Sequence, residues 1–162
     1  MHNTSKAKVA GIQNLSGDFQ KDIMQYFAEC GIFQDLMEVG DDFMVTLYAL
    51  AHQAYQNNKY HEAGKMFSVL CVMNHLERKY WLGLGASLQM EKKYLPALEC
   101  YGLAVLLHYK EPDAHLYTAE CMLAVGKKEE VKPILQGVIE LCTQKEHTSI
   151  KEKAKNLLSI LK

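Results

Sequence analysis

Residues of similar size recur every 34 positions along the middle of the chain. Ala51, Gly85 and Ala119 keep this spacing, and three further sets keep it as well. These sets are Ala63, Ala97 and Val131; Phe67, Tyr101 and Leu135; and Leu70, Ala104 and Val138. A fixed period of this length indicates a stack of similar supersecondary units, each with two helices of about 14 residues and a turn. The three repeats are then 44–77, 78–111 and 112–145.

The recurring positions hold side chains whose sizes fit two crossing helices. Ala51 and Ala63 would face each other where the helices of the first repeat cross, because a small side chain permits close packing. Phe67 would fill the space beside that crossing. A single repeat cannot bury its apolar face alone, so the repeats must stack and the two ends of the stack need caps.

The period and the residue types resemble those of tetratricopeptide (TPR) repeats. The second repeat agrees with the TPR signature at Trp81, Leu84, Gly85, Ala97, Tyr101 and Ala104. The first repeat agrees at most of these positions, and the third is degraded. The resemblance implies an all-α fold of three tandem helix-turn-helix repeats, wound into a right-handed superhelix with a concave groove.

The chain divides into three predicted regions: an N-terminal segment at 1–41, the repeats within 42–145, and a C-terminal capping helix at 146–162. The first (A) helices of the repeats are expected near 43–57, 78–91 and 112–125. The second (B) helices are expected near 60–74, 94–108 and 129–142. Pro112 suits the first turn of its helix, whereas Pro133 requires its helix to begin near Glu129 or Glu130, or to bend.

Both terminal segments carry apolar stripes at helical spacing. The C-terminal stripe is Ile150, Ala154, Leu157, Leu158 and Leu161, which suits a helix that caps the last repeat. The N-terminal stripe is Phe19, Ile23, Met24 and Phe27. The N-terminal stripe is too apolar to face water, so it either caps the first repeat or joins a second copy. We favour a weak homodimer.

The composition excludes several classes of function. Lys and Arg are scattered among Asp and Glu, with a formal net charge of −1, so no basic face for nucleic acid is expected. No apolar run approaches the ~18 residues that span a bilayer, and residues 1–20 lack the apolar stretch of a signal peptide. The five cysteines are widely spaced without a CxxC pair, which favours reduced core thiols in a cytoplasmic protein.

The patterns that could carry chemistry have simpler explanations. The run Gly83–Ser87 looks like part of a phosphate-binding loop, but it lies within a predicted helix with no preceding strand. Cys71 and His75 are four residues apart, as two metal ligands on a helix can be, but no third or fourth ligand is apparent. We therefore expect no enzyme activity, no cofactor and no metal ion.

The concave groove is the surface that remains for binding, because the A helices of a TPR stack line it. The candidate groove residues are Tyr48, His52 and Tyr55 in the first A helix, Leu82, Ala86 and Gln89 in the second, and Leu116, Glu120 and Leu123 in the third. Chaperone-adaptor TPR domains clamp a terminal carboxylate with Lys and Asn at the positions that Tyr48 and His52 occupy here. Tyr and His at these two positions remove that clamp and favour an extended, mostly apolar peptide as the ligand.

A longer run of motifs resembles one group of TPR proteins. The motifs are Leu70–His75, Trp81–Ala86, Tyr109–Pro112 and Ala119–Leu123. Their order, over about residues 40 to 145, is similar to that of the class II chaperones of bacterial type III secretion, the SycD/LcrH-like group. The resemblance implies a cytoplasmic chaperone that binds an extended segment of hydrophobic translocator proteins and keeps them soluble and unassembled before export. The alternative is a generic TPR scaffold within a stable multiprotein complex.

Overall fold

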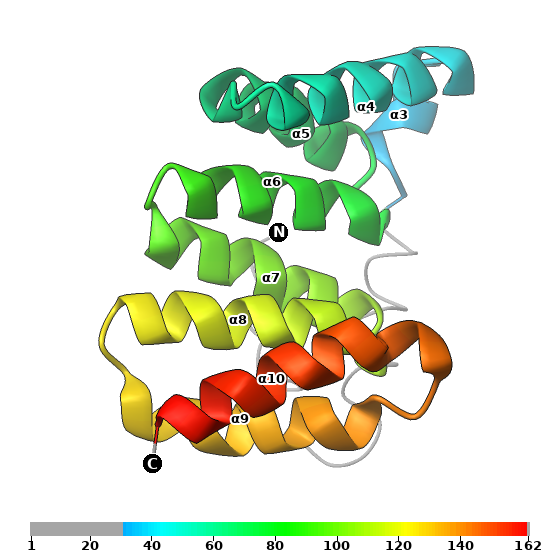
Figure 1. The fold of residues 1–162 in the computed structure, drawn as a ribbon. Helices are drawn as coiled ribbons and strands as arrows, with labels where there is room; N and C mark the ends of the chain where they lie inside the picture. The colour runs from blue at the N-terminus through cyan, green and yellow to red at the C-terminus, as the bar shows by residue number, and fades with distance from the viewer. Residues whose placement is uncertain (1–30, 162) are drawn as a thin grey trace, which may run out of the picture.

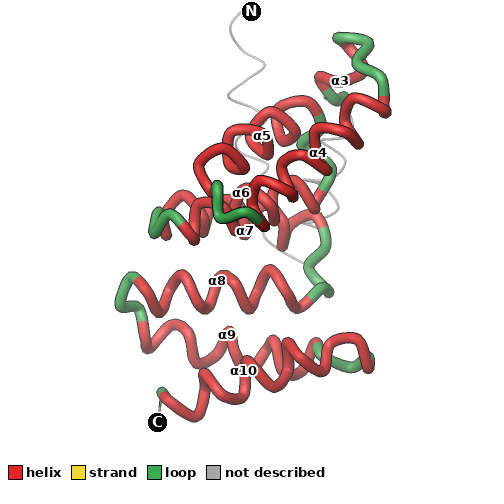
Figure 2. Tube along the Cα trace, turned by 45° about the horizontal axis from the view of Figure 1, so that its top comes forward, coloured by secondary structure: helices red, strands yellow, loops and turns green. Residues whose placement is uncertain are grey.

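The computed structural model describes residues 31–161, and this part of the chain is helical without any strand (Figures 1 and 2). The helices are α3 (Phe33–Leu36), α4 (Asp41–Gln56), α5 (Tyr60–Met73), α6 (Arg78–Met90), α7 (Tyr94–Leu107), α8 (Pro112–Ala124), α9 (Lys128–Leu141) and α10 (Thr148–Ile160), with a 3-10 turn η2 (Lys145–His147) before α10. The six repeat helices begin and end within two residues of the predicted bounds. The predicted all-α repeat fold is confirmed.

The helices pack in the order in which they follow one another along the chain. Each of α4 to α9 contacts the next, and α10 turns back to lie against α9 and α8 (Figure 1). α4, α6 and α8 are the A helices of the three repeats, and α5, α7 and α9 are the B helices. Within residues 31–161, no helix is long and apolar enough to cross a bilayer. The predicted N-terminal stripe of Phe19, Ile23, Met24 and Phe27 lies outside the described residues.

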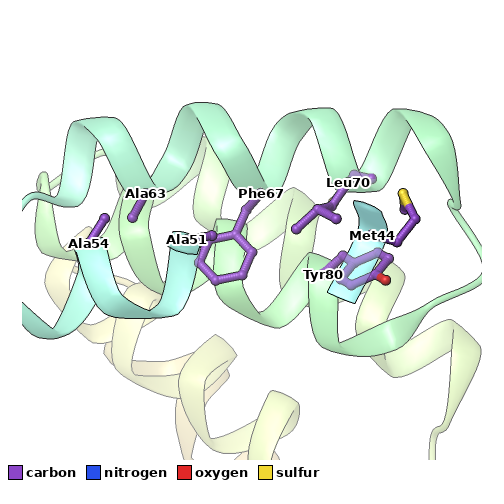
Figure 3. Packing of buried hydrophobic residues seen from close by; sticks show 8 residues of the cluster. Met44, Ala51, Ala54, Ala63, Phe67, Leu70 and Tyr80 are labelled. Atoms are coloured by element: carbon purple, nitrogen blue, oxygen red, sulfur yellow. The ribbon is translucent and has the colours of Figure 1, made fainter. Parts of the chain in front are cut away.

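Small residues allow the helices of the first two repeats to pack closely. Ala51 and Ala63 are completely buried, and Figure 3 shows the ring of Phe67 beside Ala51. A Cβ atom added at Gly83 would come within 2.3 Å of the Phe67 ring, and one added at Gly85 within 2.7 Å of the Tyr101 ring. The two glycines of the run Gly83–Ser87 therefore serve helix packing rather than phosphate binding.

The three A helices end in the same turn, which repeats every 34 residues. Asn58, Lys92 and Gly126 each adopt a positive φ, of 60°, 62° and 85°. The backbone N–H of each donates to the carbonyl three residues earlier, and the next N–H donates to the carbonyl five residues earlier. This is the Schellman arrangement, which satisfies carbonyl groups at a helix end and favours glycine at the residue of positive φ. Only the third repeat has glycine there.

Replacing Lys92 with glycine is expected to stabilise the protein. A left-handed conformation costs a residue with a Cβ atom about 1–2 kcal/mol, and glycine avoids this cost. Glycine also has more conformational entropy in the unfolded state, which offsets part of the gain in stability. We expect Lys92→Gly to raise the free energy of unfolding by about 0.5–1 kcal/mol in urea denaturation. Gly126→Ala removes glycine from the equivalent position and should lower the free energy of unfolding by a similar amount. A fall in the free energy of unfolding for Lys92→Gly, or a rise for Gly126→Ala, would contradict the turn assignment.

The stack is closed at its C-terminal end, as predicted. Ala154 of α10 is completely buried beside Leu116 of α8 and Leu135 of α9. Apolar side chains further along α10, including Leu157 and Leu158, pack against the same cluster. At the other end, the short helix α3 was not predicted. The buried amide of Gln34 in α3 donates to the carbonyl of Val39 at 3.2 Å and to Oδ1 of Asp41 at 2.8 Å.

Candidate functional site

A cavity of about 440 Å³ lies on the side of the stack formed by the A helices. Helices α4, α6 and α8 supply most of its walls, and α5, α7 and α10 contribute one residue each. The lining residues are Tyr48, His52, Tyr55, Phe67, Lys79, Leu82, Gly83, Ala86, Gln89, Met90, Tyr101, Asp113, Tyr117, Glu120 and Lys153. We call this cavity the groove.

The structure brings seven of the nine candidate residues together around the groove. These are Tyr48, His52, Tyr55, Leu82, Ala86, Gln89 and Glu120. Leu116 and Leu123, the other two candidates, do not line it. Leu116 is 1% exposed within the cluster that holds Ala154 of α10, and Leu123 packs against that cluster. The capping helix covers the face of α8 on which both leucines lie, so that face belongs to the core.

Aromatic rings form the end of the groove between α4 and α6. The ring centroid of Tyr48 lies 6.0 Å from that of Phe67 and 5.8 Å from that of Tyr80. The ammonium of Lys79 lies 5.2 Å from the centroid of the Tyr48 ring and 5.4 Å from that of Tyr80, within the range of a cation–π contact. His52 lies one turn after Tyr48, and the centroids of their two rings are 6.1 Å apart. This end offers rigid, mostly apolar contact area.

The floor of the groove is made from core residues. Phe67 is 2% exposed and Tyr101 is 1% exposed, yet both contribute to the lining. Both residues stand at the recurring aromatic position of a B helix. Their rings reach the A-helix side because Gly83 and Gly85 leave space for them. The core and the groove therefore share atoms, so changes to the floor will affect both the packing of the core and the shape of the groove.

A chain of hydrogen bonds crosses the other end of the groove. The hydroxyl of Tyr101 donates to Oε1 of Gln89 at 2.7 Å, and Nε2 of Gln89 donates to Oε2 of Glu120 at 3.2 Å. Nζ of Lys153 lies 2.5 Å from Oε1 of Glu120. Buried and half-buried polar groups at this end thereby satisfy one another, which lowers the cost of covering them with an apolar ligand.

A second ion pair joins the second and third repeats beside the groove. The Arg78 guanidinium donates to both carboxylate oxygens of Asp113, and its Nε donates to the carbonyl of Ala104 at 3.2 Å. The Arg78 side chain is 12% exposed and that of Asp113 is 26% exposed. Two parallel hydrogen bonds between a guanidinium and a carboxylate fix both side chains. The negative charge that Asp113 brings to the groove is therefore neutralised by Arg78.

Burial disfavours ionisation of the groove tyrosines and of the Cys100 thiol in α7. Burial is the main cause that raises the pKa of Tyr55, Tyr101 and Tyr117, so their hydroxyls stay neutral hydrogen-bonding groups at physiological pH. Burial also raises the pKa of the Cys100 thiol to about 11, which disfavours a reactive thiolate. Among residues 31–161, no three His, Cys, Asp or Glu side chains gather in a way that could hold a metal ion.

Several lining residues were not predicted to face the groove. Tyr117 and Gly83 each follow a position that the TPR pattern directs inward, so a wider inward face on the A helices would have included them. Phe67 and Tyr101 were assigned to the core alone. Lys153 comes from the capping helix, and no feature of the repeat period could have indicated where that helix would lie.

Comparison with known proteins finds relatives over most of the chain. A family model of the tetratricopeptide repeat matches residues 79–110. The Low calcium response locus protein H of Yersinia pestis is 33% identical over 144 residues, which cover 89% of this chain and 84% of that protein. The type III secretion translocator chaperone SycD of Yersinia enterocolitica, solved as an alternative dimer, is 32% identical with a TM-score of 0.74, over 76% of this chain and 95% of SycD. SycD in complex with a peptide of the translocator YopD is 33% identical with a TM-score of 0.73, over the same shares of the two chains.

Proposed function

Because the chain belongs to the translocator chaperones of bacterial type III secretion, we propose that its groove binds an extended, mostly apolar segment of a translocator protein. The chaperone acts in the bacterial cytoplasm, where it keeps this client soluble and unassembled until export. The observation that carries the proposal is the groove itself, in which aromatic side chains from α4, α5 and α7 meet small and neutralised groups from α6 and α8.

The dimensions of the groove suit a segment better than a folded domain. A cavity of about 440 Å³ has room for a small number of side chains, at the lower end of the range of small-molecule sites. It spans helices from all three repeats, so a chain lying across it would contact each repeat in turn. A client that inserts into membranes exposes large apolar patches in water, and such patches drive association. Occupying one segment of such a client blocks part of that association.

Self-association is a second part of the proposal. The N-terminal end of the described stack leaves Phe43 and Leu50 of α4 about half exposed, at 52% and 48%. The apolar stripe predicted at residues 19–27 of a second copy would cover such a surface. We expect deletion of residues 1–31 to convert a weak dimer into a monomer in sedimentation equilibrium. If the molar mass stays at the same multiple of the chain mass, the stripe acts as a cap within one chain.

Client dependence separates this function from that of a permanent scaffold. The translocators encoded by the same bacterium are produced alone or together with this chain, and their soluble fractions are compared. A chaperone raises the soluble fraction of its client and is recovered with it in a pull-down. Translocators that stay soluble and intact without this chain, and are not recovered with it, would contradict the proposal and favour a scaffold.

A further inference from the structure

The capping helix contributes a charged side chain to the groove. Lys153 precedes Ala154, whose burial against α8 and α9 fixes the position of this part of α10. The Lys153 side chain is 55% exposed and extends to Glu120 of α8, which is 17% exposed. Both residues line the groove. A helix that closes the stack is thus also part of the wall of the binding site.

The Glu120 carboxylate contacts one neutral amide, from Gln89, and one cation, from Lys153. The carbonyl oxygen of Gln89 accepts from Tyr101, so the amide nitrogen of Gln89 is the group that points to Glu120. The amide donates a neutral hydrogen bond to one carboxylate oxygen, and Lys153 supplies the positive charge at the other. Removing Lys153 would therefore leave a half-buried negative charge in the groove that a neutral amide only partly satisfies.

The charges around the groove occur in pairs of opposite sign, and Lys153 with Glu120 is one of these pairs. Lys79 and Lys153 are the cationic side chains of the lining, and Asp113 and Glu120 are the anionic ones. Arg78, just outside the lining, pairs with Asp113, and Glu77 lies 3.6 Å from Lys79. Every charged lining residue thus has an opposite charge beside it, so an apolar client residue meets no unpaired charge.

We propose that Lys153 is a specificity-determining residue of the groove: by neutralising Glu120, it allows uncharged client side chains at the α8 end. The inference rests on the proposed function, since it concerns the segment that the groove binds. Without Lys153, the Glu120 carboxylate would penalise apolar and acidic side chains at this end and favour a basic one. Lys153 acts through Glu120, so replacing both residues should restore the original preference.

The test measures binding of peptides by Lys153→Met, which keeps the length of the side chain but removes its charge. Peptides of about 20 residues that tile the translocators of the same bacterium are screened against the wild-type protein. The tightest binder is then remade with Ala, Lys or Glu at each position in turn. Lys155→Met is the matched control, because Lys155 lies two residues further along α10 and pairs with Glu152 of the same helix. Thermal melts establish that each variant is folded.

We expect Lys153→Met to bind the unmodified peptide about three- to tenfold more weakly at low salt, with a smaller loss at high salt. At the client position that faces Glu120, the Lys153→Met variant should bind the peptide with Lys more tightly than the peptide with Ala. The wild type and Lys155→Met should lack this preference. Glu120→Gln combined with Lys153→Met should regain the wild-type preference. An identical peptide preference in the wild type and Lys153→Met would overturn this inference and leave the proposed function unaffected. A wild type that binds none of the tiled peptides would contradict the proposed function itself.

Discussion

Phe67→Ala is expected to lower the free energy of unfolding by about 3–5 kcal/mol, the usual cost of removing a buried aromatic ring. The Phe67 side chain is 2% exposed and packs edge-on against Tyr48, with ring centroids 6.0 Å apart. It also fills the space above Gly83, where no Cβ atom could fit. Helices α4, α5 and α6 would lose a shared contact, so the cavity left behind can collapse only if two repeats move together.

Urea denaturation followed by circular dichroism measures this loss. Val69→Ala is the control, because Val69 lies on the same helix and is 41% exposed. It should cost less than about 1 kcal/mol, as expected for a change outside the core. A cost below about 1 kcal/mol for Phe67→Ala would mean that the ring is not the packing centre of the first two repeats. Because Phe67 also floors the groove, the variant should bind client segments more weakly even where it is folded.

The repeat architecture could be predicted because its constraints are periodic. Small residues such as Ala51, Ala63 and Gly85 recur at one spacing, and each is buried at a helix contact. The bounds of the helices follow from the same period, and Pro112 begins α8 as expected. Pro133 lies inside α9, which begins at Lys128, one residue before the earliest start predicted for it. Local sequence therefore determines where the repeat helices lie.

The parts that could not be predicted depend on contacts between elements outside the period. Leu116 occupies the same repeat position as Leu82, but α10 buries the first while the second lines the groove. The direction in which α10 folds back follows from apolar packing that no spacing along the chain encodes. The same packing brings Lys153 to Glu120. The prediction for the N-terminal stripe concerns residues outside the described part of the chain and stays a prediction.

Filling the groove at Ala86 is expected to have the largest effect on binding. Ala86 is a half-buried residue of α6 that lines the groove between the aromatic end and the Gln89–Glu120 end. A phenylalanine there would occupy space that a client side chain needs. Hot-spot contacts of this kind contribute about 2 kcal/mol or more, so Ala86→Phe should raise the Kd for the client segment by about thirtyfold or more.

Removing the two tyrosines is a less specific test than filling the groove. Tyr48 and Tyr55 pack against the core cluster that includes Phe67 and Tyr80, so Tyr48→Ala with Tyr55→Ala should lower stability as well as affinity. Ala86→Phe adds atoms on the open side of α6 and removes none from the core. Its effect on binding can therefore be separated from an effect on folding.

Calorimetric titration of the tightest tiled translocator peptide into folded wild type, Ala86→Phe and Ala49→Phe tests the central claim most directly. Ala49 is an exposed residue of α4 that does not line the groove, so it receives the same new side chain outside the site. We expect Ala49→Phe to bind within about threefold of the wild type and Ala86→Phe to bind about thirtyfold or more weakly. Equal affinity of wild type and folded Ala86→Phe would place the client on another surface and contradict the assignment of the groove.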